Sequence, residues 1–179
     1  MIHSIFKTKN QWKKSLISDV ARISTGSSNT QDKDDTGKYP FFIRSQNIAK
    51  SNKYIYDGEA VLTIGDGQIG KVFHYYVGKF DCHQRVYMLT DIHNTSGKYL
   101  YHYFSSFFYD RAIKMSAKNT VDSVRMDMIA DMPIHLPGQE MESKIVNILD
   151  SMDNYIAKQE SFLSTIIALK TGIIQKMFI

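Results

Sequence analysis

The residues of this chain that are best suited to chemistry are polar and basic side chains beside turns. Arg can donate two hydrogen bonds to guanine, Gln or Asn can form a pair of bonds with adenine, and Lys, Ser and Thr commonly hold phosphates. Such groups are suited to reading duplex DNA, although any domain surface of this size carries similar ones. The candidate DNA-binding residues are Arg44, Gln46, Asn47, Lys71, Gln84, Arg85, Lys118, Asn119 and Thr120.

A glycine-rich segment from Gly65 to Val72 nearly matches the sequence pattern of a phosphate-binding P-loop. That loop needs Ser or Thr after its Lys to bind magnesium, and a helix whose N-terminus faces the phosphates. Val72 stands at the hydroxyl position here, and a strand-like run follows. The segment therefore predicts a tight turn between two strands, over 60–64 and 71–77, rather than a nucleotide site.

Metal-binding and catalytic patterns are weak. The six histidines show no metal-ligand spacing, and only Cys82 and His83 place two potential ligands together. A small buried Cys beside a polar His on a strand edge explains that pair better. The sequence shows no nucleophile elbow, paired carboxylates or methyltransferase signature, so we expect no metal, cofactor or catalytic residue in this chain. A site assembled from scattered residues is the alternative.

The composition indicates one globular domain with an appendage. The chain has 179 residues, 43% of them hydrophobic and 12% aromatic, and a net charge of +4. From Met141 onward acidic and basic residues balance, so the excess of positive charge lies before it. The single cysteine suits a reducing compartment, and no apolar run reaches membrane-spanning length, so we expect a cytoplasmic protein with no membrane contact.

The first part of the chain predicts a mixed, β-rich fold. Runs of strand length cover 41–44, 60–64, 71–77 and 85–90, separated by clusters of turn-forming residues. A helix is predicted over 99–115 with Thr95 or Ser96 as its N-cap, and a short one from 123 towards 130. Pro133 and Pro137 bracket a short extended segment. We therefore predict an α+β fold, with a β-rich domain over 1–138 and a separate segment over 139–179.

The second part predicts one long helix. It contains no Pro and one Gly, and apolar residues recur at steps of three and four throughout. At about 1.5 Å per residue it would extend roughly 55–60 Å. The apolar stripe is three columns wide, more than a two-stranded seam needs, so we expect more than one neighbour; the alternative is a helix folded back on its own domain. The candidate dimerisation residues are Ile145, Leu149, Met152, Ile156, Leu163, Ile166, Ile173 and Met177.

Several short motifs follow one another in order along nearly the whole chain. They are Trp12 with Leu16-Ile-Ser-Asp-Val20 and Gly26, Tyr39-Pro-Phe-Phe-Ile-Arg-Ser-Gln-Asn-Ile48, Ile64-Gly-Asp-Gly67 with Gly70, Gly78-Lys-Phe80, His83-Gln-Arg-Val86, Ile134-His-Leu-Pro137 and Leu169-Lys-Thr-Gly172-Ile-Ile-Gln175-Lys-Met-Phe178. Together they resemble the specificity (S) subunit of type I restriction-modification systems. The closing motif after a long helix is the most specific of them.

The resemblance implies a non-catalytic, DNA-reading subunit. The usual S subunit has two target recognition domains and two long helices that pair as an antiparallel coiled coil, whereas this chain has one of each. It therefore resembles a half subunit. The implied partners are double-stranded DNA, a second copy or another S fragment, modification (M) subunits that use S-adenosylmethionine, and a restriction (R) subunit that uses ATP and Mg²⁺. Two copies related by a two-fold axis would read a palindromic bipartite target.

Two points stay open at this level. The family often has Glu-Gln near the start of its helix, whereas Met141 and Glu142 stand there in this chain, which leaves the contacts of that helix start undetermined. A protein-interaction adaptor without DNA contact is the alternative function, and an independent nuclease or methyltransferase is a third.

Overall fold

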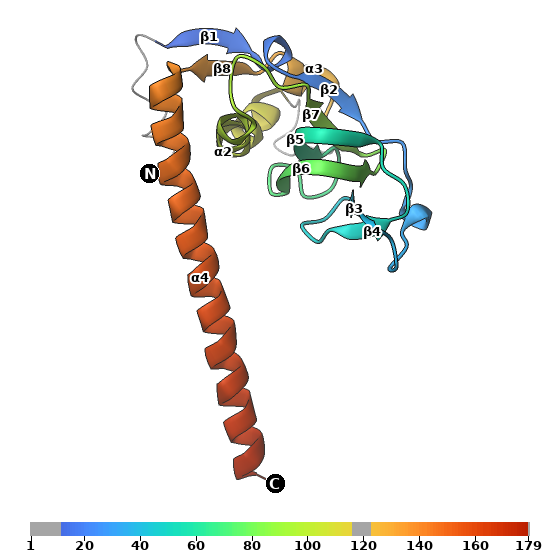
Figure 1. The fold of residues 1–179 in the computed structure, drawn as a ribbon, viewed down its shortest axis with the longest axis vertical. Coiled ribbons are helices and arrows are strands. Elements are labelled where there is room, and N and C mark those ends of the chain that lie inside the picture. The colour runs from blue at the N-terminus through green and yellow to red at the C-terminus, as the bar shows by residue number, and fades with distance from the viewer. Residues whose placement is uncertain (1–11, 116–122, 179) are drawn as a thin grey trace.

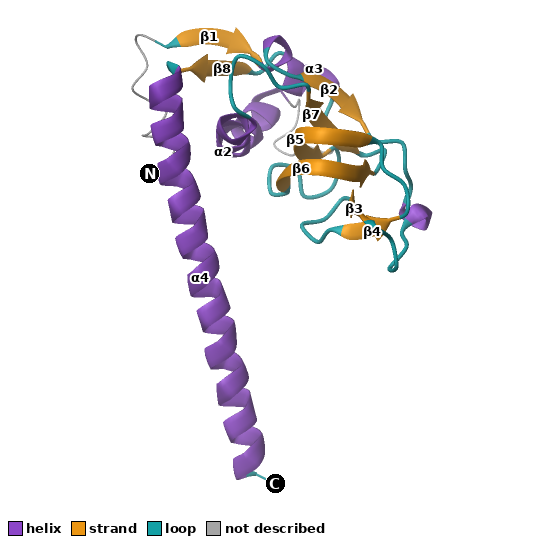
Figure 2. Ribbon diagram, viewed as in Figure 1, coloured by secondary structure: helices purple, strands orange, loops and turns teal. Residues whose placement is uncertain are grey.

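The computed structural model describes residues 12–115 and 123–178, and it shows a sheet domain from which one long helix projects (Figures 1 and 2). The fold is α+β, as predicted from the sequence. Its strands are β1 (Lys13–Leu16), β2 (Arg22–Thr25), β3 (Tyr39–Phe42), β4 (Ala49–Ser51), β5 (Tyr56–Ile64), β6 (Phe73–Cys82), β7 (Val86–Thr90) and β8 (Pro133–Leu136). Its α-helices are α2 (Gly97–Met115), α3 (Met126–Ala130) and α4 (Gln139–Met177).

The main sheet has six strands in the order β2-β7-β5-β6-β3-β4. All neighbours are antiparallel except β3 and β6, which run parallel. The sequence predicts its central strands because they are rich in β-branched and aromatic residues. The peripheral strands β2 and β4, and β1 outside this sheet, were not predicted, since they are short and largely polar.

Both faces of the main sheet are buried, because side chains alternate along each strand. On β5, Val61 joins one core, which α2 completes with Phe104 and Phe108. The neighbouring Leu62 faces a second core, which contains Phe42 and Phe80. A strand buried on both faces reads as a continuous apolar run, and this is why β5 was visible in the sequence.

The predicted helix over 99–115 is confirmed as α2, which begins two residues earlier. The Ser96 hydroxyl accepts a hydrogen bond from the Tyr99 N–H at 3.2 Å, so Ser96 is the N-cap. The segment between Pro133 and Pro137 is β8, which pairs antiparallel with β1 and leads directly into α4. The start of α4 is therefore attached to the sheet domain by a two-stranded ribbon.

The first three turns of α4 pack on α2 of the same chain. Ile145 and Leu149 are 4% and 2% exposed and belong to the core that contains α2. Glu142 is buried, and its carboxylate accepts hydrogen bonds from the Ser96 N–H at 2.6 Å and the Thr95 hydroxyl at 3.1 Å. This places a negative charge at the N-terminus of α2, where the helix dipole favours it.

Charged groups strengthen this attachment at the next residue of α4. Asp150 of α4 pairs with the Lys98 ammonium of α2, and its other oxygen lies 3.0 Å from Nε2 of His102. Although partial burial opposes the shift, hydrogen bonds from Lys98 and His102 leave the pKa of Asp150 lowered. The contacts at the helix start, which the sequence left undetermined, are therefore contacts with α2.

Beyond Asp150 the helix leaves the domain (Figure 1). Apart from the half-buried Gly172, every described residue from Ser151 to Phe178 is exposed. Ile145 and Leu149, predicted as dimerisation residues, are instead covered by the chain's own α2, because helical periodicity does not reveal which neighbour buries a stripe. None of the helices in the described part of the chain combines the length and the apolar character that crossing a bilayer requires.

Replacing Leu149 by Ala should lower the free energy of unfolding by about 2–5 kcal/mol, because it removes a side chain that is 2% exposed from the α2–α4 contact. Urea denaturation followed by circular dichroism measures this change. The control is Val77→Ala on β6, where the side chain is 59% exposed and the expected loss is below about 1 kcal/mol. Equal losses in the two variants would show that α4 is not anchored in the core.

Candidate nucleic-acid interface

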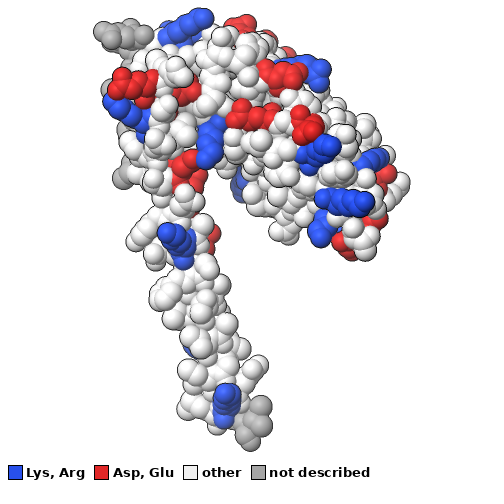
Figure 3. Space-filling model, viewed as in Figure 1, with Lys and Arg blue, Asp and Glu red and all other residues white. Residues whose placement is uncertain are grey.

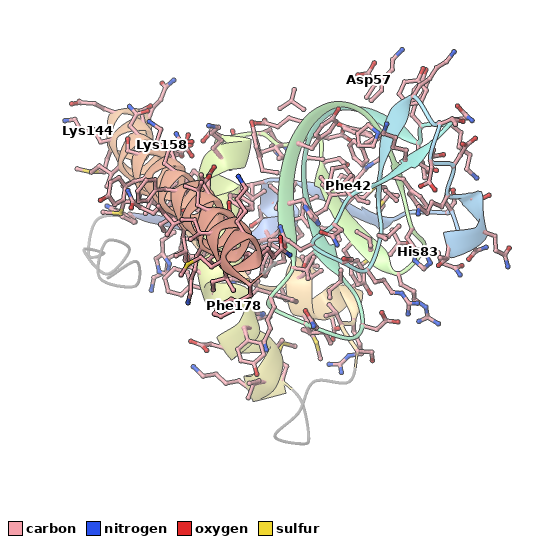
Figure 4. The ribbon with its side chains drawn as sticks, turned by 90° about the horizontal axis from the view of Figure 1, so that it is seen from below. Phe42, Asp57, His83, Lys144, Lys158 and Phe178 are labelled. Carbon is pink, nitrogen blue, oxygen red and sulfur yellow. The ribbon has the colours of Figure 1, made fainter. Side chains whose placement is uncertain are left out.

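Three loops of the sheet domain meet at one end of the sheet. They contain positions 44–47 after β3, 65–72 between β5 and β6, and 83–85 between β6 and β7. They meet because the end of β3 pairs with the end of β6 and the end of β5 pairs with the start of β7, so both strand ends lie beside the β6–β7 turn. The His83 N–H donates to the Phe42 carbonyl at 3.0 Å, and the Gly65 N–H donates to the Arg85 carbonyl at 2.7 Å. In Figure 4, Phe42 and His83 lie in the part of the domain that faces away from α4.

A groove of about 420 Å³ lies between the first two of these loops. Across it, Nη1 of Arg44 lies 3.3 and 3.4 Å from the two carboxylate oxygens of Asp66. Nε2 of His74 lies 3.1 Å from the Ser45 carbonyl and so attaches the first loop to β6. The groove is lined by Arg44, Ser45, Gln46, Asn47, Asp66, Gly67 and Gln68. Because these residues are polar or glycine, the groove offers hydrogen-bonding groups without an apolar wall.

The turn between β6 and β7 presents two exposed polar side chains, Gln84 and Arg85. Nδ1 of His83 accepts a hydrogen bond from the Arg85 N–H at 3.0 Å, which fixes the turn from within. The Gln84 N–H donates to the Ser28 carbonyl at 2.8 Å, and its side-chain amide donates to Asn29. The Gln84 amide is thus partly engaged within the protein.

The electrostatics of this end are set by two arginines and one acid around a buried imidazole. Burial lowers the pKa of His83, the charges of Arg44 and Arg85 lower it further, and the carboxylate of Asp66 acts in the opposite direction. His83 is therefore neutral at neutral pH, and the charge of this group of side chains is positive. A positive surface that presents hydrogen-bonding side chains suits the edges and phosphates of a nucleic acid.

The structure brings most of the candidate DNA-binding residues together. Six of them are exposed on the three loops: Arg44, Gln46, Asn47, Lys71, Gln84 and Arg85. The other three, Lys118, Asn119 and Thr120, lie outside the described residues. Ser123, where the description resumes, forms a β-bridge with Asp66. The role of each residue in binding DNA stays a prediction.

Sequence reasoning missed Asp66 and Gln68 as members of this site. Both flank Gly67, in the segment that was interpreted only as a turn. The available signal was an acid and an amide at an exposed turn. Asp66 and Arg44 are 22 residues apart, so no local pattern connects them.

The two alternative sites in the sequence have structural explanations. The glycine segment is a turn followed by β6, and Gly67 and Gly70 adopt φ values of +81° and +73° that favour glycine. Cys82 is fully buried, and its thiol lies 3.8 Å from the carbonyls of His83 and Val86. Residues 12–115 and 123–178 contain no group of three or more side chains positioned to hold a metal ion.

The surface differs between the two parts of the molecule. On the face shown in Figure 3, Lys, Arg, Asp and Glu intermingle on the sheet domain, whereas the projecting part of α4 is largely uncharged. The large apolar residues exposed on this part include Tyr155, Phe162, Leu163, Ile173 and Phe178. The sheet domain therefore suits a polar ligand, and α4 suits an apolar partner.

Solved structures share this architecture. The chain is similar to the S subunit of a type I restriction-modification system from M. genitalium, with a TM-score of 0.66 and 19% identity, over 88% of this chain and 43% of that one. It is similar to the HsdS subunit from Thermoanaerobacter tengcongensis, with a TM-score of 0.63 and 14% identity, over 88% and 42% of the two chains. At these identities the likeness shows the fold alone: this is a protein with the fold of an S subunit.

Sequence comparison gives the family. Residues 9–168 match the family described as type I restriction modification DNA specificity domain. The chain therefore belongs to this family, as its motifs indicated. It is also 28% identical over 145 residues to the EcoDI specificity subunit of Escherichia coli, and this match covers 79% of this chain and 31% of the relative. The chain spans about a third of that relative and about two-fifths of each S subunit structure.

Cys82 should react with a thiol reagent such as Ellman's reagent more than about tenfold more slowly in the native chain than in denaturant. Burial raises the pKa of its thiol, and the neighbouring Asp81 carboxylate raises it further, so the thiolate is scarce at pH 8. The denatured chain supplies the reference rate. Fast labelling of the native chain would contradict the buried, structural role given to Cys82.

Proposed function

We propose that this chain is the DNA sequence-recognition subunit of a type I restriction-modification complex, and that its three loops enter the major groove of one half-site. The observation that supports this proposal is the convergence of Arg44, Gln46, Asn47 and Arg85 at one exposed end of the sheet. They come from two segments that are far apart in sequence, and each type is able to read a base edge. Phosphate contacts from neighbouring basic groups would add salt-sensitive affinity.

In this proposal the chain directs chemistry that other subunits perform. Modification subunits would bind S-adenosylmethionine and methylate the target, and a restriction subunit would use ATP and Mg²⁺. The family assignment supports this division, since the matched domain is described as a DNA specificity domain. We expect the complex in the cytoplasm, where its DNA substrate is found.

The projecting part of α4 would hold two recognition domains at a fixed separation. Its candidate dimerisation residues that stay exposed, between 39% and 71%, are Met152, Ile156, Leu163, Ile166, Ile173 and Met177. The chain covers about two-fifths of each S subunit structure, so a second copy or another S fragment would restore approximately the full length. An antiparallel coiled coil of two α4 helices would give a palindromic bipartite target.

A protein-interaction adaptor is the second candidate. The apolar surface of α4 would serve an adaptor as well as a recognition subunit. The two proposals differ at the loops, because only a DNA reader needs base-matching side chains there. An adaptor would show no salt-dependent affinity for DNA, either alone or together with a methyltransferase subunit.

Replacing Arg85 by Ala should reduce the preference for target over random duplex by about 1–3 kcal/mol, because one base-reading group is lost. Base-resolution methylation mapping in cells with and without the chain gives the target, and gel-shift titration at several salt concentrations gives the preference. The control is Arg22→Ala: Arg22 is equally charged and exposed, but it pairs with Asp91 at 3.1 Å on the far side of the sheet. Unchanged discrimination in Arg85→Ala removes Arg85 from the site.

The double substitution Ile166→Asp and Ile173→Asp should shift the chain from dimer to monomer, since it puts charges into the proposed apolar seam. Both side chains are about half exposed in the single chain, at 46% and 58%, so the sheet domain should unfold at an unchanged temperature. Sedimentation equilibrium and thermal denaturation measure the two effects. Ser164→Asp, on the opposite side of the helix, is the control. A wild-type chain that stays monomeric, alone and in complex, rules out this form of dimerisation.

A further inference from the structure

Asp66 lies at the proposed reading end, where an acid is unfavourable for binding phosphates. A carboxylate close to the DNA backbone adds like-charge repulsion, and surfaces that only grip phosphates use Lys, Arg and hydroxyl groups. Asp66 is on the turn between β5 and β6, and its side chain is 26% exposed. A carboxylate in this position is therefore better suited to a partner other than the phosphate backbone of the duplex.

The backbone around Asp66 is held from two sides. The Gly65 N–H donates to the Arg85 carbonyl at 2.7 Å, and the Gly65 carbonyl accepts from the Val124 N–H at 2.8 Å. Asp66 itself forms a β-bridge with Ser123. The carboxylate consequently has a defined position on the wall of the groove.

Across the groove, the Asp66 carboxylate contacts only one of the three nitrogen atoms of the Arg44 guanidinium. Both of its oxygens are 3.3–3.4 Å from the same nitrogen, Nη1 of Arg44. This geometry is longer than a charge-assisted hydrogen bond of about 2.7–2.9 Å, and it is not the two-nitrogen fork that Arg forms with a carboxylate. The guanidinium has five donors, so its other nitrogen atoms can bond a ligand without breaking this contact.

A hydrogen-bond donor, Arg44, beside an acceptor, Asp66, matches the groups that a G·C base pair presents in the major groove. Guanine presents the acceptors O6 and N7, which Arg binds with two hydrogen bonds, and its cytosine partner presents the N4 amino donor, which Asp or Glu accepts. An A·T pair offers no comparable match, because thymine presents an acceptor and a methyl group to the acid. Among the described residues, those that line the groove are polar or glycine, and none is an apolar residue that would contact that methyl group.

We propose that Arg44 and Asp66 together read one G·C base pair, with Arg44 donating to guanine and Asp66 accepting from the cytosine N4 amino group. This assignment deepens the proposed function and depends on it. Asp66 thereby acts as a specificity-determining residue: it also orients Arg44 in the unbound protein.

The test is selection of bound sequences from a randomised duplex DNA library by the purified chain, alone and with a co-purified methyltransferase subunit. Wild type should enrich a motif with one G·C pair that Asp66→Ala and Asp66→Asn relax by about 10- to 100-fold, with the other positions unchanged. Arg44→Ala should relax the same pair. The matched control is Asp91→Asn, which alters another exposed Arg–Asp pair, Arg22–Asp91 at 3.1 Å, away from the groove.

The outcomes separate this inference from the function on which it rests. If wild type enriches no motif, both fail. If wild type enriches a motif and the Asp66 variants keep it unchanged, or weaken binding to all sequences alike, only the G·C assignment fails. Thermal denaturation checks folding. An Asp66 variant that unfolds at the same temperature as Asp91→Asn is still folded, so its relaxed motif reflects a loss of specificity.

Discussion

The contact between α2 and the first turns of α4 is the constraint on which the rest of the molecule depends. Two apolar side chains, Ile145 and Leu149, are buried there, and full burial of such a side chain contributes about 1.5–3 kcal/mol. Glu142 orients the contact, because its carboxylate accepts hydrogen bonds from the Ser96 N–H and the Thr95 hydroxyl, directly before α2 begins. Apolar packing holds the two helices together, and the carboxylate fixes how they are aligned. A helix anchored in this way keeps a constant geometry relative to the loops at the far end of the sheet, which a spacer between two recognition domains requires.

The second constraint is the strand pairing on either side of the β6–β7 turn. The end of β6 pairs in parallel with β3 and the start of β7 pairs with the end of β5, so loops that are far apart in sequence come to one end of the sheet. This is how Arg44, Asp66 and Arg85 come to lie around one buried histidine. The side chains of the two arginines are exposed and that of Asp66 is partly exposed, whereas the backbone beneath them is fixed by strand pairing and by hydrogen bonds between the loops. Rigid backbone under exposed polar side chains is the arrangement that reading base edges requires.

The sequence predicted those elements whose signal is local. The long helix was visible because its apolar residues keep helical spacing over 39 residues without proline, and β5 was visible because it is buried on both faces. The short strands β1, β2 and β4 carry polar sequences whose strand character comes from pairing with a distant segment. For the same reason the Arg44–Asp66 contact could not be predicted: it depends on the pairing of β3 with β6 and of β5 with β7, which are distant in sequence. Nor could periodicity show that Ile145 and Leu149 are buried by α2, since a stripe on a helix has the same pattern whichever neighbour covers it.

The two parts of the chain separate two kinds of recognition. The proposed reading end of the sheet domain offers charged and polar groups, and contacts of such groups with a polyanion weaken with salt. The projecting part of α4 carries only two acidic and three basic residues and a wide apolar stripe, whose burial is largely insensitive to salt. If DNA reading and helix pairing used the same surface, as the proposed function does not require, an apolar seam would take up area that hydrogen bonds to base edges need. In the proposed function, their separation along the helix would let the polar end vary with the sequence that is read while the apolar end keeps the complex together.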